Sequence, residues 1–173
     1  GGDWRMGGTG TGQEDSLVTA MLEEAFDLDV TYVPFSGGGE VAKNLIGGHV
    51  DSTVNNPAEQ LAFWKAGESR PIATFTEERL DIMPEVPTMR ELGHDIVYSM
   101  QRSFVGPPGM PAEAQAFYVD MFEQVAATEE WQKYAAEQAL LTDLLTGDAL
   151  QEYFLAEREK HRALLEQLGE LSG

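Results

Sequence analysis

The stretch Arg5–Phe26, RMGGTGTGQEDSLVTAMLEEAF, places a short apolar segment, a glycine-rich loop and a helical pattern in direct succession. Residues Trp4–Met6 can supply only a very short strand before the loop Gly7–Gly12. From Gln13 onward, apolar residues recur at the spacing of one helix face: Leu17, Met21, Leu22, Ala25 and Phe26. A strand, a tight loop and an amphipathic helix in this order predict the repeating unit of an α/β fold.

The same alternation continues toward the middle of the chain. Asp29–Val33 is rich in β-forming residues, and a second glycine loop, Ser36–Gly39, follows it and opens a helix over Glu40–Ile46. A short strand is predicted over Val50–Val54, and a helix over Pro57–Lys65. We therefore expect a short, mostly parallel sheet flanked by helices.

The second half of the chain has a different character. Further strands are predicted over Pro71–Phe75 and Ile96–Val105, with an irregular, charged segment between them. Beyond Pro111 the pattern is almost entirely helical, with helices predicted over Ala112–Ala127 and over about Asp148–Leu168. Between these two, Thr128 is a suitable N-cap for another helix.

Composition excludes several classes of function. The 173 residues carry 30 Asp and Glu against 11 Lys and Arg, a formal charge of −19, which argues against binding to nucleic acid or to an anionic membrane surface. There is no cysteine, so disulfides, thiol nucleophiles and cysteine-based metal sites are excluded. No apolar run reaches the roughly 18 residues that membrane insertion requires. The acidity is typical of a protein from a halophile or of an acidic extracytoplasmic protein.

The two glycine loops contain the clearest chemical signal. Each precedes a helix, so backbone N–H groups and the positive end of a helix dipole can converge on one anion without a basic side chain. The hydroxyl groups of Thr9, Thr11 and Ser36 would add donors for a carboxylate or a phosphate. The alternative interpretation is that the glycines only permit tight turns.

Asn55 and Asn56 follow a predicted strand and form a second candidate site. In open α/β sheets the carboxyl ends of the strands border the ligand crevice, and an amide side chain offers both a donor and an acceptor. An Asx turn that leads into the helix at Pro57 explains the pair equally well.

The common catalytic and cofactor motifs are absent. Residues 8–12 read GTGTG, which is not the dinucleotide pattern GxGxxG, and neither a P-loop nor an HExxH nor a GxSxG sequence occurs. We therefore expect no catalytic residue, no metal site and no cofactor.

Five segments together resemble the solute receptors of tripartite tricarboxylate transporters, also called Bug-type receptors. In the order in which the family has them, they are YVPFSGGGE (32–40), GGHVD (47–51), KAG (65–67), PEVPT (84–88) and VGPPGMP (105–111). The resemblance covers roughly residues 3–169. It implies a periplasmic, two-lobed, Venus-flytrap receptor of the type II periplasmic-binding-protein class, which captures a small di- or tricarboxylate or related organic acid and delivers it to membrane permease subunits. It also implies that the protein is not an enzyme.

Compared with that family, the chain starts abruptly and is interpreted as a piece that lacks the N-terminal lobe. Residues 1–105 would then be the second, ligand-binding lobe, and the helices of 106–173 would pack on the first. The resemblance places the ligand-binding positions at these residues: Gly8, Thr9, Gly10, Thr11, Gly12, Gln13, Ser36, Gly37, Gly38, Asn55 and Asn56.

One position departs from the family pattern. Where the family often has Ser or Thr followed by His, this chain has Gln13, Glu14 and Asp15. A carboxylate at Asp15 beside an anion site is unfavourable unless it faces away or meets a cationic part of the ligand. An amino-bearing ligand therefore becomes an alternative.

Two further hypotheses remain open from the sequence. An α/β enzyme domain could use the glycine loops to hold a phosphorylated substrate or cofactor, and such a domain would show turnover. A structural oligomerisation module is the third hypothesis, because the apolar helix faces after Pro111 need a cover. We expect the isolated chain to form a dimer or a higher assembly.

Overall fold

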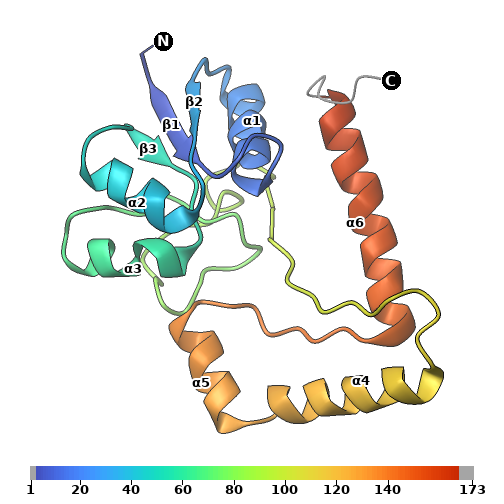
Figure 1. Cartoon of the computed structure of the whole chain (residues 1–173). Helices are drawn as coiled ribbons and strands as arrows, with labels where there is room; N and C mark the ends of the chain where they lie inside the picture. The colour runs from blue at the N-terminus through green and yellow to red at the C-terminus, as the bar shows by residue number, and fades with distance from the viewer. Residues whose placement is uncertain (1–2, 168–173) are drawn as a thin grey trace. The chain divides into compact units, whose positions relative to one another are not determined.

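A parallel three-stranded sheet lies at the centre of the N-terminal part of the chain (Figure 1). The computed structural model describes residues 3–167. The strands are β1 (Arg5–Gly8), β2 (Thr31–Pro34) and β3 (Ser52–Thr53), in the order β2-β1-β3. In the register, Gly8 is opposite Pro34, and Gly7 is opposite Thr53. The carboxyl ends of all three strands therefore lie at the same edge of the sheet.

Each strand leads through a short loop into a helix. These helices are α1 (Glu14–Phe26), α2 (Gly38–Ile46) and α3 (Pro57–Lys65). Their positions confirm the predicted α/β alternation, with α2 beginning two residues earlier than expected. Gly67 follows the last helix with a φ of 74°, a left-handed conformation that suits the position after a helix end.

The core of this part forms between the sheet and α1 and α2. The buried apolar side chains come from β1, from both helices and from the segment before β3: Met6, Leu17, Val18, Val41, Ala42 and Val50. Gly7 is part of the same packing, because a Cβ at this position would lie 3.1 Å from Val50. This core fixes the strand ends from which the three loops leave.

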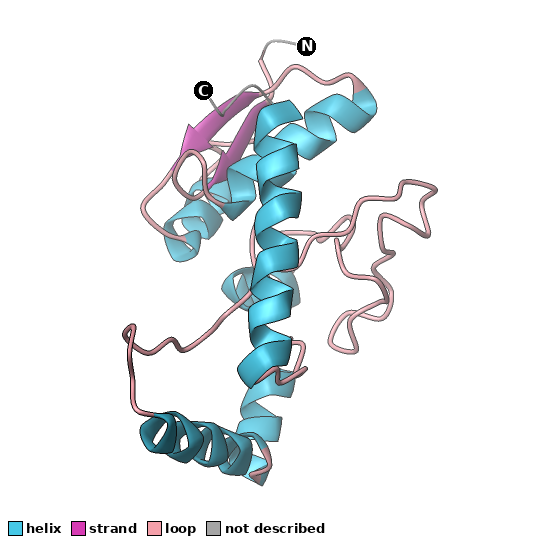
Figure 2. Cartoon of the chain, turned by 90° about the vertical axis from the view of Figure 1, so that its right-hand side faces the viewer, coloured by secondary structure: helices cyan, strands magenta, loops and turns pink. Residues whose placement is uncertain are grey.

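The strands predicted over Pro71–Phe75 and Ile96–Val105 are wrong. Both segments are loop (Figure 2), apart from one isolated bridge between Thr74 and Thr88. Tyr98 N–H donates to Phe75 C=O, but no ladder continues from this bond. The physical reason is that β-forming residues make a strand only where a neighbouring strand pairs with them.

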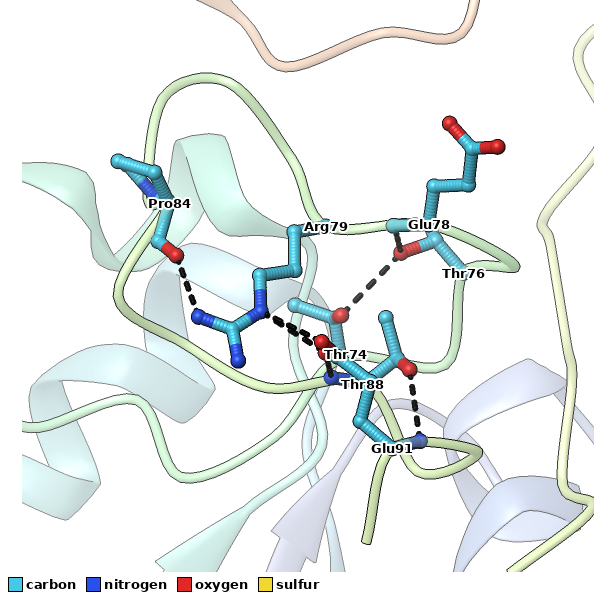
Figure 3. A network of polar contacts seen from close by, with 7 residues as sticks. All are labelled: Thr74, Thr76, Glu78, Arg79, Pro84, Thr88 and Glu91. Atoms are coloured by element: carbon cyan, nitrogen blue, oxygen red, sulfur yellow. Dashed lines mark hydrogen bonds and ion pairs between the residues drawn. The ribbon is translucent and has the colours of Figure 1, made fainter.

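A polar network holds the irregular segment instead (Figure 3). The Arg79 guanidinium donates from Nε to both oxygens of the Glu91 carboxylate, at 3.0 and 2.8 Å, and from Nη1 to the Pro84 carbonyl at 2.7 Å. Glu91 also accepts from Thr88 N–H at 2.9 Å, and its own N–H donates to the Thr88 hydroxyl. The ion pair lowers the pKa of Glu91, and Thr88 N–H lowers it further.

From Gln101 onward the chain forms a second compact unit, which is helical. Its helices are α4 (Ala112–Ala126), α5 (Glu129–Glu137) and α6 (Gly147–Gln167). The Thr128 hydroxyl accepts from Trp131 N–H at 3.2 Å, so the predicted N-cap is confirmed. The end of the last predicted helix, Leu168, lies outside the described residues.

Candidate functional site

The three loops that follow β1, β2 and β3 meet at one edge of the sheet. Two backbone bonds join them there: Phe35 N–H donates to Gly8 C=O at 2.9 Å, and Val54 N–H donates to Gly7 C=O at 3.1 Å. A side-chain bond joins the third loop to the start of α2, since Asn55 Nδ2 donates to Gly38 C=O at 3.2 Å. The residues predicted to bind the ligand therefore lie together at the carboxyl ends of the strands, the edge at which open α/β sheets bind ligands.

In the first loop, side chains of the chain itself occupy most of the backbone donors. Gly10 N–H donates to the Gln13 side chain at 3.1 Å, and Gly12 N–H donates to the Ser16 hydroxyl at 2.8 Å. Gly12 has a φ of 79°, which explains why glycine is needed there. The amide of Thr11 is left without a partner among the described residues.

The peptide groups around Thr9 are held from two sides. Thr9 N–H donates to the buried Asp15 carboxylate at 2.9 Å, and Thr9 C=O accepts from the Tyr32 hydroxyl at 2.5 Å. Gly8 leaves room for both partners, because an added Cβ would overlap the Tyr32 hydroxyl and lie 2.7 Å from the Asp15 Cβ. Asp15 faces the loop and stabilises it.

Burial is the largest cause of a raised pKa at Asp15. The hydrogen bonds from Thr9 act against this shift, and the negative charges of Glu59 and Glu14 add to it. Burial also raises the pKa of Tyr32 well above its usual value, and the charge of Asp15 adds to that effect. Tyr32 therefore stays a protonated donor to Thr9 throughout the physiological pH range.

The second loop is the one that retains a run of unpaired donors. Ser36 gives both its N–H and its hydroxyl to the Glu40 carboxylate, at 3.1 and 2.5 Å. The next three amides, those of Gly37, Gly38 and Gly39, have no partner in the described part of the chain. They lie at the N-terminus of α2, where the helix dipole favours an anion.

In the third loop, Glu59 organises both asparagines. Its Oε2 accepts from Asn55 Nδ2 and from Asn56 N–H, each at 3.0 Å. The Asn55 carbonyl oxygen accepts from Gln60 Nε2, also at 3.0 Å. Asn56 is the N-cap of α3 and Glu59 its third residue, so the pair forms a capping box.

The predicted site residues thus lie together, but their amides are not equally available. Thr9, Gly10, Gly12, Ser36 and Asn56 donate their backbone N–H groups to side chains of this chain. The side-chain amide of Asn55 is also engaged, because its Nδ2 donates a hydrogen bond to Glu59 and its Oδ1 accepts one from Gln60. That these residues contact a ligand stays a prediction, and the free donors are concentrated at Gly37–Gly39.

Sequence reasoning missed the side chains that shape the loops. Glu59 and Glu40 had a recognisable signal, because a carboxylate three or four residues after an Asn or Ser before a helix is typical of N-terminal capping. Tyr32 had none, since its bond to Thr9 joins residues 23 apart in the chain. The free amide of Gly39, which follows the predicted Ser36–Gly38, could be found from its place in the first turn of a helix.

Two substitutions of Asp15 separate its role as the hydrogen-bond acceptor for Thr9 from the effect of its buried charge. We expect Asp15→Ala to lower the free energy of unfolding by about 1–3 kcal/mol, because Thr9 N–H, which is half-buried, loses its acceptor. Asp15→Asn keeps an acceptor and removes the buried charge, so its stability at pH 7 should equal or exceed that of the parent chain.

The pH dependence of stability follows from the raised pKa of Asp15. The folded chain holds the proton more tightly than the unfolded chain, so the parent loses stability as the pH rises from about 4 through the folded pKa. The stability of Asp15→Asn should lack this decrease. Denaturant unfolding at pH 4 to 8 measures the free energy of unfolding of the parent chain and of Asp15→Asn. The same pH dependence in both would contradict the role given to Asp15.

Neither a metal centre nor a membrane span is found in the part of the chain that the structure describes. No group of three or more potential metal ligands gathers there. None of the helices there is both long and apolar enough to cross a membrane.

A comparison with protein families identifies the chain. Residues 2–169 match the tripartite tricarboxylate transporter family receptor, so the chain belongs to this receptor family, which is not a family of enzymes. The chain is 26% identical over 160 residues to a UPF0065 protein, in the gbd 5' region, of Cupriavidus necator, covering 91% of this chain and 49% of that protein. It is 28% identical over 99 residues to Protein BugT of Bordetella pertussis, covering 57% of this chain and 30% of that protein. The chain thus spans half or less of the length of these relatives.

Solved structures share the fold. A protein from R. palustris solved with adipate superimposes with a TM-score of 0.88 at 20% identity, over 96% of this chain and 56% of that one. The periplasmic binding protein BugD superimposes with a TM-score of 0.76 at 19% identity, over 96% of this chain and 56% of that one. A TctC solute-binding protein from Polaromonas superimposes with a TM-score of 0.75 at 22% identity, over 95% of this chain and 57% of that one. The fold is therefore that of periplasmic binding proteins, as predicted.

Proposed function

We propose that this chain provides the carboxylate-binding half of an extracytoplasmic solute receptor for a tripartite tricarboxylate-type transporter. The observation that carries the proposal is the run of three unpaired amides at Gly37, Gly38 and Gly39. Consecutive N–H groups at a helix N-terminus bind an anion without a basic side chain. The family match and the adipate named with the R. palustris neighbour support a carboxylate as that anion.

The ligand's carboxylate is bound by the α2 amides, with Thr11 N–H in the neighbouring loop as a further donor. The remaining loop donors are held by Asp15, Glu40 and Glu59, which fix the shape of the site. The loops therefore need little rearrangement when the ligand binds, and this reduces the entropic cost of binding.

The helical unit completes the receptor in this proposal. It exposes large apolar side chains, with Phe104 78% and Phe117 64% exposed, and these are suited to packing against a second lobe. The complete receptor has two lobes, lies outside the cytoplasm and transfers its ligand to permease subunits. Self-association of the isolated chain through the same faces stays a prediction.

The test is calorimetric titration of the full-length protein that carries this sequence. The probes are aliphatic mono- and dicarboxylates of three to six carbons, with ATP and NAD as competitors for the same donors. We expect saturable binding of a carboxylate without turnover, and stabilisation by about 2.7 kcal/mol at a hundred times the Kd. Binding of the nucleotides alone would contradict the receptor function and support the α/β enzyme domain.

A further inference from the structure

Within the three loops and the first turns of their helices, every ionisable side chain is acidic. Residues 9–16, 36–40 and 54–60 contain Glu14, Asp15, Glu40 and Glu59, and no Lys, Arg or His. Glu40 is held at the start of α2 by both donors of Ser36. A ligand bound at the α2 amides therefore meets a surface that supplies hydrogen-bond acceptors and no compensating positive charge.

Glu59 places its carboxylate beside the first turn of α2. A Cβ added at Gly38 would overlap all three atoms of the Glu59 carboxylate group, so this group lies directly against the Gly38 backbone. Its Oε2 accepts the hydrogen bonds from Asn55 and Asn56. No bond to Oε1 is formed by any of the described residues, which leaves that oxygen as an available acceptor.

Asp15 contributes a second negative charge at the same edge of the sheet, where its carboxylate accepts from Thr9 N–H. Its side chain comes from α1 and is buried, with 8% of its surface exposed. Burial is the main cause of its raised pKa, and the charge of Glu59 contributes. The two carboxylates therefore repel each other, and a further negative charge beside them would add to this repulsion.

Gln60 is linked to Glu59 through Asn55 and carries an acceptor that no described residue satisfies. Its Nε2 donates to Asn55 Oδ1 at 3.0 Å and lies 3.4 Å from Thr53 Oγ1. Its Oε1 is buried and accepts no hydrogen bond within residues 3–167. A buried carbonyl oxygen without a donor is unfavourable, and a donor group on a ligand would satisfy it.

We propose that Glu59 is a specificity-determining residue, which selects a ligand with a single carboxylate and a hydrogen-bond-donating or cationic remainder and discriminates against a second carboxylate. This inference rests on the proposed function. The ligand's carboxylate binds the amides of Gly37–Gly39, while an ammonium or hydroxyl group faces Glu59 Oε1 and Gln60 Oε1. The selected class differs from the dicarboxylate adipate named with the R. palustris neighbour.

The experiment compares three probes of equal chain length: butyrate, 4-aminobutyrate and succinate, with their three- to six-carbon homologues. Calorimetry is carried out on the full-length protein, on Glu59→Gln and on Glu68→Gln. Glutamine keeps an acceptor for Asn55 and Asn56, so the fold is retained, and thermal unfolding checks this. Glu68 is exposed and lies beyond α3, so its variant is a control for the same change in net charge.

We expect the parent protein to bind 4-aminobutyrate, or its homologue of fitting length, more tightly than the matching dicarboxylate. In Glu59→Gln the affinity for the dicarboxylate relative to the monocarboxylate should rise about tenfold, as expected for removing one charge from a partly buried site. Glu68→Gln should leave this ratio unchanged.

Three outcomes overturn the inference. If the parent protein binds the dicarboxylate more tightly than the amino-bearing monocarboxylate, the proposed selectivity is wrong and the receptor function still stands. Equal weakening of all probes in Glu59→Gln shows that Glu59 only positions Asn55 and Asn56, which again leaves the receptor function standing. Failure of every carboxylate to bind the parent protein overturns the proposed function itself, and the selection with it.

Discussion

Gly8→Ala is expected to lower the free energy of unfolding by about 1–3 kcal/mol, the range for overpacking a well-packed interior. The added Cβ would overlap the Tyr32 hydroxyl and approach the Asp15 Cβ to 2.7 Å. Neither partner can move away without losing its hydrogen bond to Thr9. Urea unfolding monitored by circular dichroism measures the change.

Gly37→Ala is the matched control for this prediction. Its φ is −178°, an extended conformation that alanine adopts readily, and an added Cβ meets no atom within 4 Å. The effect of Gly37→Ala on the free energy of unfolding should stay within about 0.5 kcal/mol, because the added methyl group disturbs no neighbour. Equal destabilisation by the two alanines would show that the packing around Gly8 is not what requires glycine.

Gly39→Pro is expected to weaken carboxylate binding by about ten- to a hundredfold while leaving the fold intact. Proline removes one of the three unpaired amides of α2, and a hydrogen bond to a charged group contributes about 1.5–3 kcal/mol. Proline is tolerated in the first turn of a helix, where the N–H has no partner in the helix. Calorimetric titration of the full-length protein with its carboxylate ligand measures the loss.

Gly39→Ala separates the missing amide from the added side chain. An added Cβ at this position meets nothing within 4 Å, and alanine keeps the N–H group. The alanine variant should therefore bind like the parent protein, and its thermal stability should be no lower than that of the parent. If the proline variant binds as tightly as the alanine variant, the Gly39 amide does not hold the ligand.

The parts of the fold that follow local rules could be predicted from the sequence. The helix over residues 14–26 follows from apolar spacing, and the helix over residues 57–65 from the proline at its start and the glycine after its end. The cap at Thr128 depends on one side chain. The two wrong strands depend on pairing, which is not a local property. Phe104 and Val105 are β-forming residues, yet they are 78% and 81% exposed in an unpaired loop.

The three loops of the candidate site could be predicted from the sequence, and the pairing of their donors could not. Glycine loops between strands and helices indicate where an anion binds, whichever residues surround them. Which amides remain free depends on where Asp15, Glu40 and Glu59 direct their carboxylates, and these directions depend on packing between elements. The bond from Asn55 to Gly38 joins residues 17 apart and has no counterpart in the local pattern.

The most direct test of the carboxylate site is an NMR titration of the 15N-labelled full-length protein with its carboxylate ligand. The account predicts that the amide signals of Gly37, Gly38 and Gly39 shift the most, because a charge-assisted hydrogen bond forms at each free N–H. The amides of Thr9 and Ser36, already bound to Asp15 and Glu40, should shift less. Saturable binding with unchanged signals at Gly37–Gly39 would contradict the central claim.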